Sequence, residues 1–134
     1  MILSKKYLDK LDKYRLAGCP PATQSIPTNL ANRQKCIDEA HYGPLNPNEP
    51  NDEYWKAKAK QFNDNVEDAK SARCGNCAAF NQTKVMLDCI AHAIGDDAWD
   101  VIKAGDLGYC EFYDFKCAAN RTCDAWVAGG PIVD

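Results

Sequence analysis

Apolar residues recur at helical spacing over most of the chain, and this spacing is lost towards the C-terminus. From Ser4 to Leu16 an apolar residue returns every three or four positions, which predicts an amphipathic helix that Pro20 and Pro21 bring to an end. With Thr28 as the first N-cap, the same spacing predicts further helices over residues 28–43, 51–63, 66–73, 83–95 and 97–105. From Gly105 onwards glycines and aromatic residues replace the helical pattern, which indicates short strands and tight turns.

This pattern predicts an α+β fold in two parts. A helical N-terminal arm or subdomain occupies residues 1–72, and a small irregular module, rich in cysteine and aromatic residues, occupies residues 73–134. A chain of 134 residues has the length of one domain, and folding at this size buries about two thirds of the unfolded surface. A hydrophobic core is therefore possible without covalent cross-links.

Charge and hydropathy argue against several classes of protein. The formal net charge is −3 and the isoelectric point is near 5.3, which disfavours a broad nucleic-acid-binding face. No apolar run approaches the length of a membrane span, and the N-terminal residues lack the apolar stretch of a secretory leader. Hydrolytic motifs and nucleotide-binding fingerprints are also missing. We therefore expect a soluble cytoplasmic protein that is not an enzyme and binds neither nucleic acid nor membranes.

Cysteines carry the main chemical signal. The chain has eight, and six of them fall between residues 74 and 123. The stretch "RCGNCAAF" (73–80) holds a C-x-x-C pair, whose sulfurs can point the same way at a tight turn that Gly75 permits. Such a pair can bind zinc, hold an iron–sulfur cluster or act as a redox dithiol. The other ligands of a four-sulfur site could come from Cys89, Cys110, Cys117 and Cys123.

The motifs "CGNCAAF", "GYCEFYDF" and "CDAW" together resemble the cluster-binding half of high-potential iron–sulfur proteins, over about residues 73–129. The resemblance implies one [4Fe–4S] cluster whose ligands are Cys74, Cys77, Cys110 and Cys123. It also implies an aromatic wall around the cluster, formed by Phe80, Tyr109, Phe112, Phe115 and Trp126. The gap from Cys77 to Cys110 is longer than in that family. The same cysteine- and aromatic-rich C-terminal part is also similar to small iron–sulfur proteins carried by tailed bacteriophages.

An aromatic wall would decide which oxidation states such a cluster adopts. A [4Fe–4S]²⁺ core with four thiolates has a net charge of −2, and an apolar environment penalises each further negative charge. We therefore expect the net charge of the ligated cluster to cycle between −2 and −1 rather than between −2 and −3. The family resemblance implies the same redox couple.

Other roles for the cysteines remain open. Four thiolates with a C-x-x-C knuckle also suit structural zinc, and a dithiol or a set of disulfides would use the same residues. Cys89 lies on the apolar face of its helix, which indicates a buried free thiol, a ligand in place of Cys110 or a partner for Cys117. Cys19 and Cys36 could pair with each other, although free thiols are expected in a reducing compartment.

Two classes of function follow from a bound cluster. It could be a structural staple within a larger protein assembly, such as a bacteriophage virion or tail component made in the host cytoplasm, or it could be a one-electron carrier. The alternative is a structural zinc-binding interaction module held by the same four cysteines.

Overall fold

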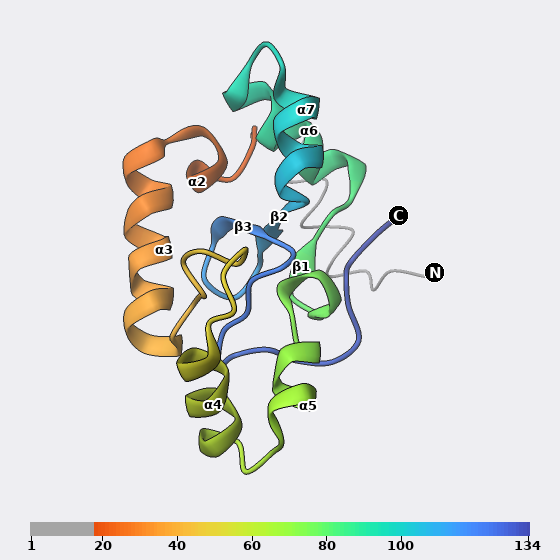
Figure 1. Cartoon of the computed structure of the whole chain (residues 1–134). Coiled ribbons are helices and arrows are strands. Elements are labelled where there is room, and N and C mark those ends of the chain that lie inside the picture. Colours follow the sequence, from red (N-terminus) through yellow and green to blue (C-terminus); the bar gives the residue numbers. More distant parts are fainter. Residues whose placement is uncertain (1–17) are drawn as a thin grey trace.

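The computed structural model describes residues 18–134 and shows helices arranged around a small antiparallel sheet (Figure 1). The sheet has the order β1–β2–β3, with the strands Phe80–Asn81, Leu107–Cys110 and Phe115–Ala118. In its register Phe80 faces Cys110, and Cys110 in turn faces Phe115. The predicted α+β class and the short C-terminal strands are confirmed, whereas the predicted helix over residues 4–16 lies outside the described residues.

Helix α3 (Ile26–Ala40) flanks one side of the sheet and differs from its predicted range at both ends (Figure 1). Ser25 is the N-cap in place of Thr28, because its hydroxyl accepts a hydrogen bond from the backbone N–H of Thr28 at 3.3 Å. The helix ends at Ala40, before Gly43, because His41 adopts a left-handed conformation with φ of 52°.

The other predicted helices form within a few residues of their expected ranges. They are α4 (Asp52–Gln61), α5 (Val66–Ser71), α6 (Lys84–Ile94) and α7 (Ala98–Gly105). Two short elements were not predicted, namely α2 (Pro21–Gln24) and the 3₁₀ turn η1 (Cys74–Asn76). Pro21 is the first residue of α2, so it starts a helix where the sequence pattern indicated a stop, as the fixed φ of proline allows.

Three buried clusters of apolar side chains form the core. The first, here called the cysteine core, contains Cys36, Ala40, Tyr42, Cys74, Cys77, Ala79, Phe80, Phe115, Cys117, Ala119 and Cys123. The third joins α4 to α5 through Trp55, Ala59 and Ala69. The cysteine core draws residues from both sides of residue 72, while the division of the chain into two domains there stays a prediction.

The second cluster, here called the aliphatic core, lies among α2, α6, α7 and β2. Its buried residues are Ala22, Met86, Ile90, Ile102 and Tyr109. A disulfide between Cys19 and Cys89 ties the segment before α2 to α6. This bond corrects the expectation of free thiols at both positions, and it means that Cys89 is not free to replace Cys110 as a ligand.

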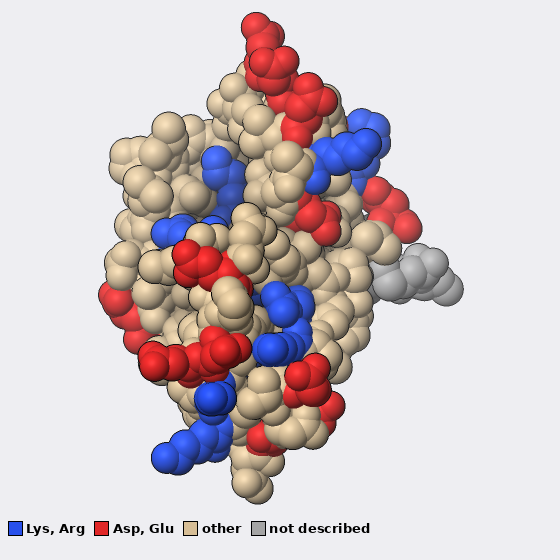
Figure 2. Space-filling model, viewed as in Figure 1, with Lys and Arg blue, Asp and Glu red and all other residues tan. Residues whose placement is uncertain are grey.

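The surface carries mixed charge. Figure 2 shows basic and acidic side chains interspersed over the face that it presents. Within residues 18–134 no helix is long and apolar enough to cross a membrane. The expected absence of nucleic-acid and membrane partners stays a prediction.

Candidate metal centre

The four cysteines predicted as ligands line a single hollow in the cysteine core. Cys74 and Cys77 come from η1 and the residue after it, Cys110 ends β2, and Cys123 lies in the loop after β3. The other residues around the hollow are Ala79, Phe80, Phe112, Cys117 and Trp126. The volume is about 20 Å³, enough for about one water molecule. Three of the five predicted wall residues, Phe80, Phe112 and Trp126, therefore line this hollow.

The C-x-x-C turn is held by backbone hydrogen bonds to the loop that leads to Cys123. The N–H of Cys74 donates to the carbonyl of Arg121 at 2.6 Å, and the N–H of Gly75 donates to that of Ala119 at 2.8 Å. A Cβ atom at Gly75 would lie 3.0 Å from the Cβ of Ala119, so glycine permits this close approach. Two ligand segments distant in the sequence are thus joined by main-chain contacts.

Asn76, the second residue inside the C-x-x-C pair, connects this turn to Trp126. Its side-chain oxygen accepts hydrogen bonds from the backbone N–H of Arg73 at 2.9 Å and from the Trp126 indole N–H at 2.8 Å. The indole N–H also reaches the carbonyl of Arg73 at 2.9 Å. These bonds hold the half-buried indole ring at the edge of the hollow.

The C-terminal segment supports the turn from behind. The N–H of Ala78 donates to the carbonyl of Val127 at 2.7 Å, and the N–H of Gly130 donates to that of Asn76 at 3.2 Å. A Cβ atom at Gly130 would overlap the carbonyl group of Cys77, so only glycine fits there. The last residues of the chain are therefore part of the scaffold of the C-x-x-C pair.

Several of the predicted ligand sulfurs accept hydrogen bonds from the backbone. The N–H of Ala79 lies 3.5 Å from the Sγ of Cys77, and the N–H of Tyr113 lies 3.5 Å from the Sγ of Cys110. The backbone of Ala125 also donates to Cys123 and lowers its pKa. Backbone donors of this kind stabilise negative charge on sulfur, and they tune the potential of thiolate-bound clusters.

The thiols differ in how readily they ionise. A hydrogen bond from the Cys36 thiol lowers the pKa of Cys123 to about 7, and the same bond, with burial, raises the pKa of Cys36. Burial raises the pKa of Cys110 to about 12. Burial, together with a hydrogen bond to Cys74, also raises the pKa of Cys117. Cys123 is therefore an acidic thiol in a core where burial favours the neutral form.

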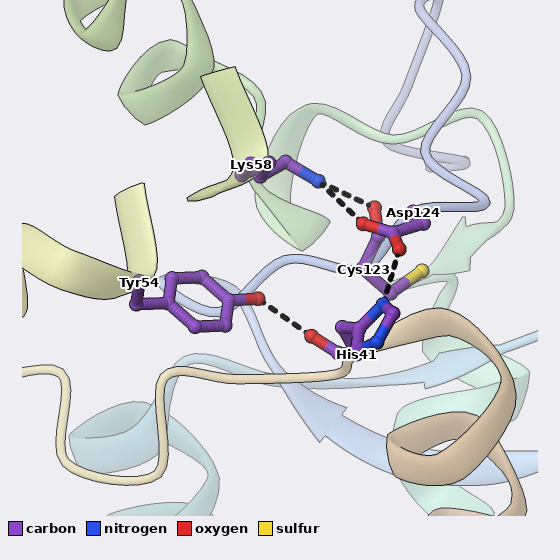
Figure 3. Close-up of polar contacts among 5 residues, drawn as sticks. All are labelled: His41, Tyr54, Lys58, Cys123 and Asp124. Carbon is purple, nitrogen blue, oxygen red and sulfur yellow. Dashed lines mark hydrogen bonds and ion pairs between the residues drawn. The ribbon is translucent and has the colours of Figure 1, made fainter. Parts of the chain in front are cut away.

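A buried lysine holds the Cys123 loop in place (Figure 3). Lys58 is only 6% exposed, and its Nζ donates to the carbonyl of Cys123 at 2.9 Å and lies 3.6 Å from Oδ1 of Asp124. The other carboxylate oxygen of Asp124 lies 2.6 Å from Nδ1 of His41. Lys58 is not among the residues that the sequence motifs selected. Its spacing from Trp55, three residues earlier, could have indicated the buried face.

A larger cavity adjoins the hollow on the side of α4 and α5. Its volume is about 340 Å³, and its lining includes Lys58, Phe62, Asp124, Cys123 and Trp126. Cys123 and Trp126 therefore form part of both linings. Of the cysteines in the described part of the chain, Cys123 is the only one that lines this larger cavity.

Two of the predicted wall residues lie elsewhere. Tyr109 points into the aliphatic core, because neighbouring residues of β2 face opposite sides of the sheet and Cys110 faces the hollow. Phe115 is buried in the cysteine core, where its ring meets that of Tyr42 edge-on at 4.9 Å, but it does not line the hollow. The sequence motif could not distinguish these positions, because it treats every aromatic residue near a cysteine alike.

Comparison with protein-family models, with curated proteins and with solved structures finds no match to this chain. The resemblance to high-potential iron–sulfur proteins therefore stays a prediction from the sequence motifs. Over residues 18–134, no three histidine, cysteine or acidic side chains are placed so that they could hold one metal ion. The chain offers a bound group the thiols around the hollow and the scaffold behind them.

Proposed function

We propose that this protein binds one [4Fe–4S] cluster through Cys74, Cys77, Cys110 and Cys123. The observation that carries the proposal is the convergence of these four thiols, from three separate segments, on one apolar hollow. Thiolates are the usual ligands of such clusters, and apolar surroundings with backbone donors to sulfur are the usual setting. The donor set fits the group in number, chemistry and polarity.

The fit in volume requires the walls to move. A hollow of about 20 Å³ is too small for a four-iron cube, so the ligand side chains must separate when the group is loaded. The segments that carry the ligands are a 3₁₀ turn, the end of the central strand β2 and a loop. Such segments change conformation more easily than helices do. Phe112 is 56% exposed and lies on the outer wall, so its ring can turn outward without opening the core.

The role that we infer first is a structural staple. Four sulfur–iron bonds would join η1, the end of β2 and the loop after β3, which the fold otherwise connects through short strands and individual hydrogen bonds. A group that binds the folded state alone contributes its binding free energy to folding. We extend this proposal to an assembly with other proteins, such as a virion or tail component, on the strength of the sequence resemblance.

A one-electron carrier is the second candidate, and the position of Phe112 favours it. Its exposed ring lines the hollow directly, so a cluster there would lie close to the protein surface. When bound, the group would supply a one-electron couple, and the apolar wall would favour the change between charges −2 and −1. The protein's own contribution would be ligation, exclusion of water and the backbone donors on sulfur.

The test is the metal and acid-labile sulfide content of protein loaded under anaerobic conditions with ferrous iron and sulfide. We expect four irons and four sulfides per chain. Cys110→Ala and Cys123→Ala should each lose most of both, whereas the matched variant Cys117→Ala, another thiol on the same hollow, should retain them. Tightly bound zinc with no sulfide would overturn the cluster and favour the four-cysteine zinc module.

Voltammetry and thermal unfolding of the loaded protein separate the two roles. A staple predicts a midpoint of thermal unfolding that rises on loading, together with a cluster that shows no reversible redox wave. A carrier predicts a reversible one-electron wave at positive potential, as expected for the −2/−1 couple. A loaded protein that shows neither the rise nor the wave would contradict both roles.

A further inference from the structure

Cys36, which is not among the predicted ligands, lies against a predicted ligand. It is fully buried in α3 and belongs to the same buried cluster as Cys123, and its thiol interacts with the sulfur of Cys123. Positions 36 and 40 share one face of the helix, and the carbonyl of Ala40 accepts a hydrogen bond from the N–H of Asp124 at 2.7 Å. The helix face that carries Cys36 is therefore anchored directly to the Cys123 loop.

The loop is also fixed on both sides of Cys123. Gly43 and Thr122 exchange a pair of backbone hydrogen bonds at 3.0 and 2.7 Å, and Lys58 donates to the carbonyl of Cys123 at 2.9 Å. These contacts hold the Cys123 loop against the helix face that carries Cys36, within one buried cluster. Two free thiols in such an arrangement form a disulfide when an oxidant reaches one of them.

We propose that Cys36 and Cys123 form an oxidisable thiol pair that a peroxide converts to a disulfide. The Cys123 thiol attacks the peroxide O–O bond, giving a sulfenic acid and one water. Cys36 then attacks that sulfur, which forms the S–S bond and releases a second water. In sum, two thiols and one hydrogen peroxide give one disulfide and two waters, and the two electrons pass from sulfur to the peroxide oxygens.

The cavities indicate why Cys36 and Cys123 react before a second pair of cysteines in the same core. The core holds a second contact of the same kind, between Cys117 and Cys74, but neither of these residues lines the larger cavity. Cys123 lines both the narrow hollow and the cavity of about 340 Å³, so a small oxidant can approach it from the side of α4 and α5. The pair Cys117 and Cys74 therefore serves as the control, against which the rate of disulfide formation by Cys36 and Cys123 is compared.

The disulfide would withdraw one of the four cluster ligands. This consequence rests on the proposed function, whereas the formation of the disulfide does not. A chain oxidised in this way would have Cys74, Cys77 and Cys110 available but not Cys123, so it would load iron and sulfide only after a thiol reductant had released the sulfur. The pair would then make loading depend on the redox state of the surroundings.

The experiment uses the full-length, metal-free chain, first reduced and then treated with a few equivalents of hydrogen peroxide, alkylated, digested and mapped by mass spectrometry. We expect a Cys36–Cys123 cross-link beside Cys19–Cys89, formed several-fold faster than Cys74–Cys117. Cys36→Ala should abolish this cross-link, and Cys117→Ala, which also removes a buried thiol that is not a predicted ligand, should leave it unchanged. Cys123 that is oxidised to a sulfinic acid, or linked elsewhere, while Cys36 stays free would overturn the proposal.

A loading assay then distinguishes the two proposals. The reduced chain should take up iron and sulfide, the peroxide-treated chain should take up several-fold less, and treatment with dithiothreitol should restore uptake. If the reduced chain does not load at all, the proposed function fails, and the cross-link map still decides the thiol pair. If the reduced chain loads but no Cys36–Cys123 link forms, only the inference about the pair fails.

Discussion

The aliphatic core and the cysteine core use cysteine in opposite ways. In the aliphatic core a disulfide, Cys19–Cys89, supplements side chains such as Met86 and Ile90 that helices enclose. In the cysteine core five free thiols are buried and a sixth, Cys110, packs against them, and turns and short strands supply most of them. We expect the aliphatic core to be stable without a bound group, and the proposed function predicts that the cysteine core gains stability from the group that its thiols bind.

Removing the disulfide should cause the largest loss of unfolding free energy, and this loss should come from the aliphatic core. The bond joins residues 70 apart, and a closed loop of that length restricts the unfolded chain by about 4 kcal/mol. We expect the double variant Cys19→Ala with Cys89→Ala to lose a stabilisation of this order in urea unfolding. Its iron and sulfide uptake should stay intact at a temperature where it is folded, and a selective loss of uptake would contradict the separation of the two cores.

Truncation of a buried aliphatic residue tests the same separation. Ile90 is fully buried in the aliphatic core, so Ile90→Ala should cost about 3 kcal/mol of unfolding free energy through lost burial and the cavity that it leaves. Val101, half exposed on α7, is the control, and Val101→Ala should change stability by less than about 0.5 kcal/mol. Equal losses in the two variants would show that the aliphatic core is not the stable part of the metal-free chain.

The buried lysine tests the scaffold of the cysteine core. Lys58→Met keeps the length of the side chain but removes the buried ammonium that donates to the carbonyl of Cys123 and pairs with the carboxylate of Asp124, at a cost of about 2 kcal/mol. Lys60→Met, on the exposed side of α4, should cost nothing measurable. We also expect the Lys58 variant to take up iron and sulfide more slowly, and the time course of iron uptake would show this difference. Identical rates for both variants would mean that this contact does not position the ligand.

The pH dependence of the stability of the metal-free chain should also arise in the cysteine core, because two of its thiols have shifted pKa values. The pKa of Cys123 is lowered to about 7 from its usual 9, so the folded state binds fewer protons than the unfolded state between these values, and stability rises. The pKa of Cys110 is raised to about 12, so above pH 9 the folded state binds more protons and stability falls. Urea unfolding across this range should therefore show a maximum near pH 9, and a steady rise to pH 11 would contradict it.

Sequence patterns predicted those features that depend on near neighbours. The helical spacing placed α4 to α7, and the cysteine motifs selected four residues that the structure brings to one hollow. The contacts of Cys36 with Cys123 and of Cys19 with Cys89 could not be predicted, because each joins segments that meet only through tertiary packing. The buried position of Lys58 and the burial of Tyr109 on the side of the sheet away from the hollow were readable in principle, from a helix face and from strand alternation.

The fluorescence of Trp126 should report directly on the hollow. Its indole lines the hollow and is hydrogen-bonded to Arg73 and Asn76, so it would lie next to any iron that the cysteines hold. The other two tryptophans lie outside the lining, Trp55 buried between α4 and α5 and Trp99 52% exposed on α7. Quenching of indole fluorescence during loading, lost in Trp126→Phe, would therefore follow the filling of this one hollow in real time.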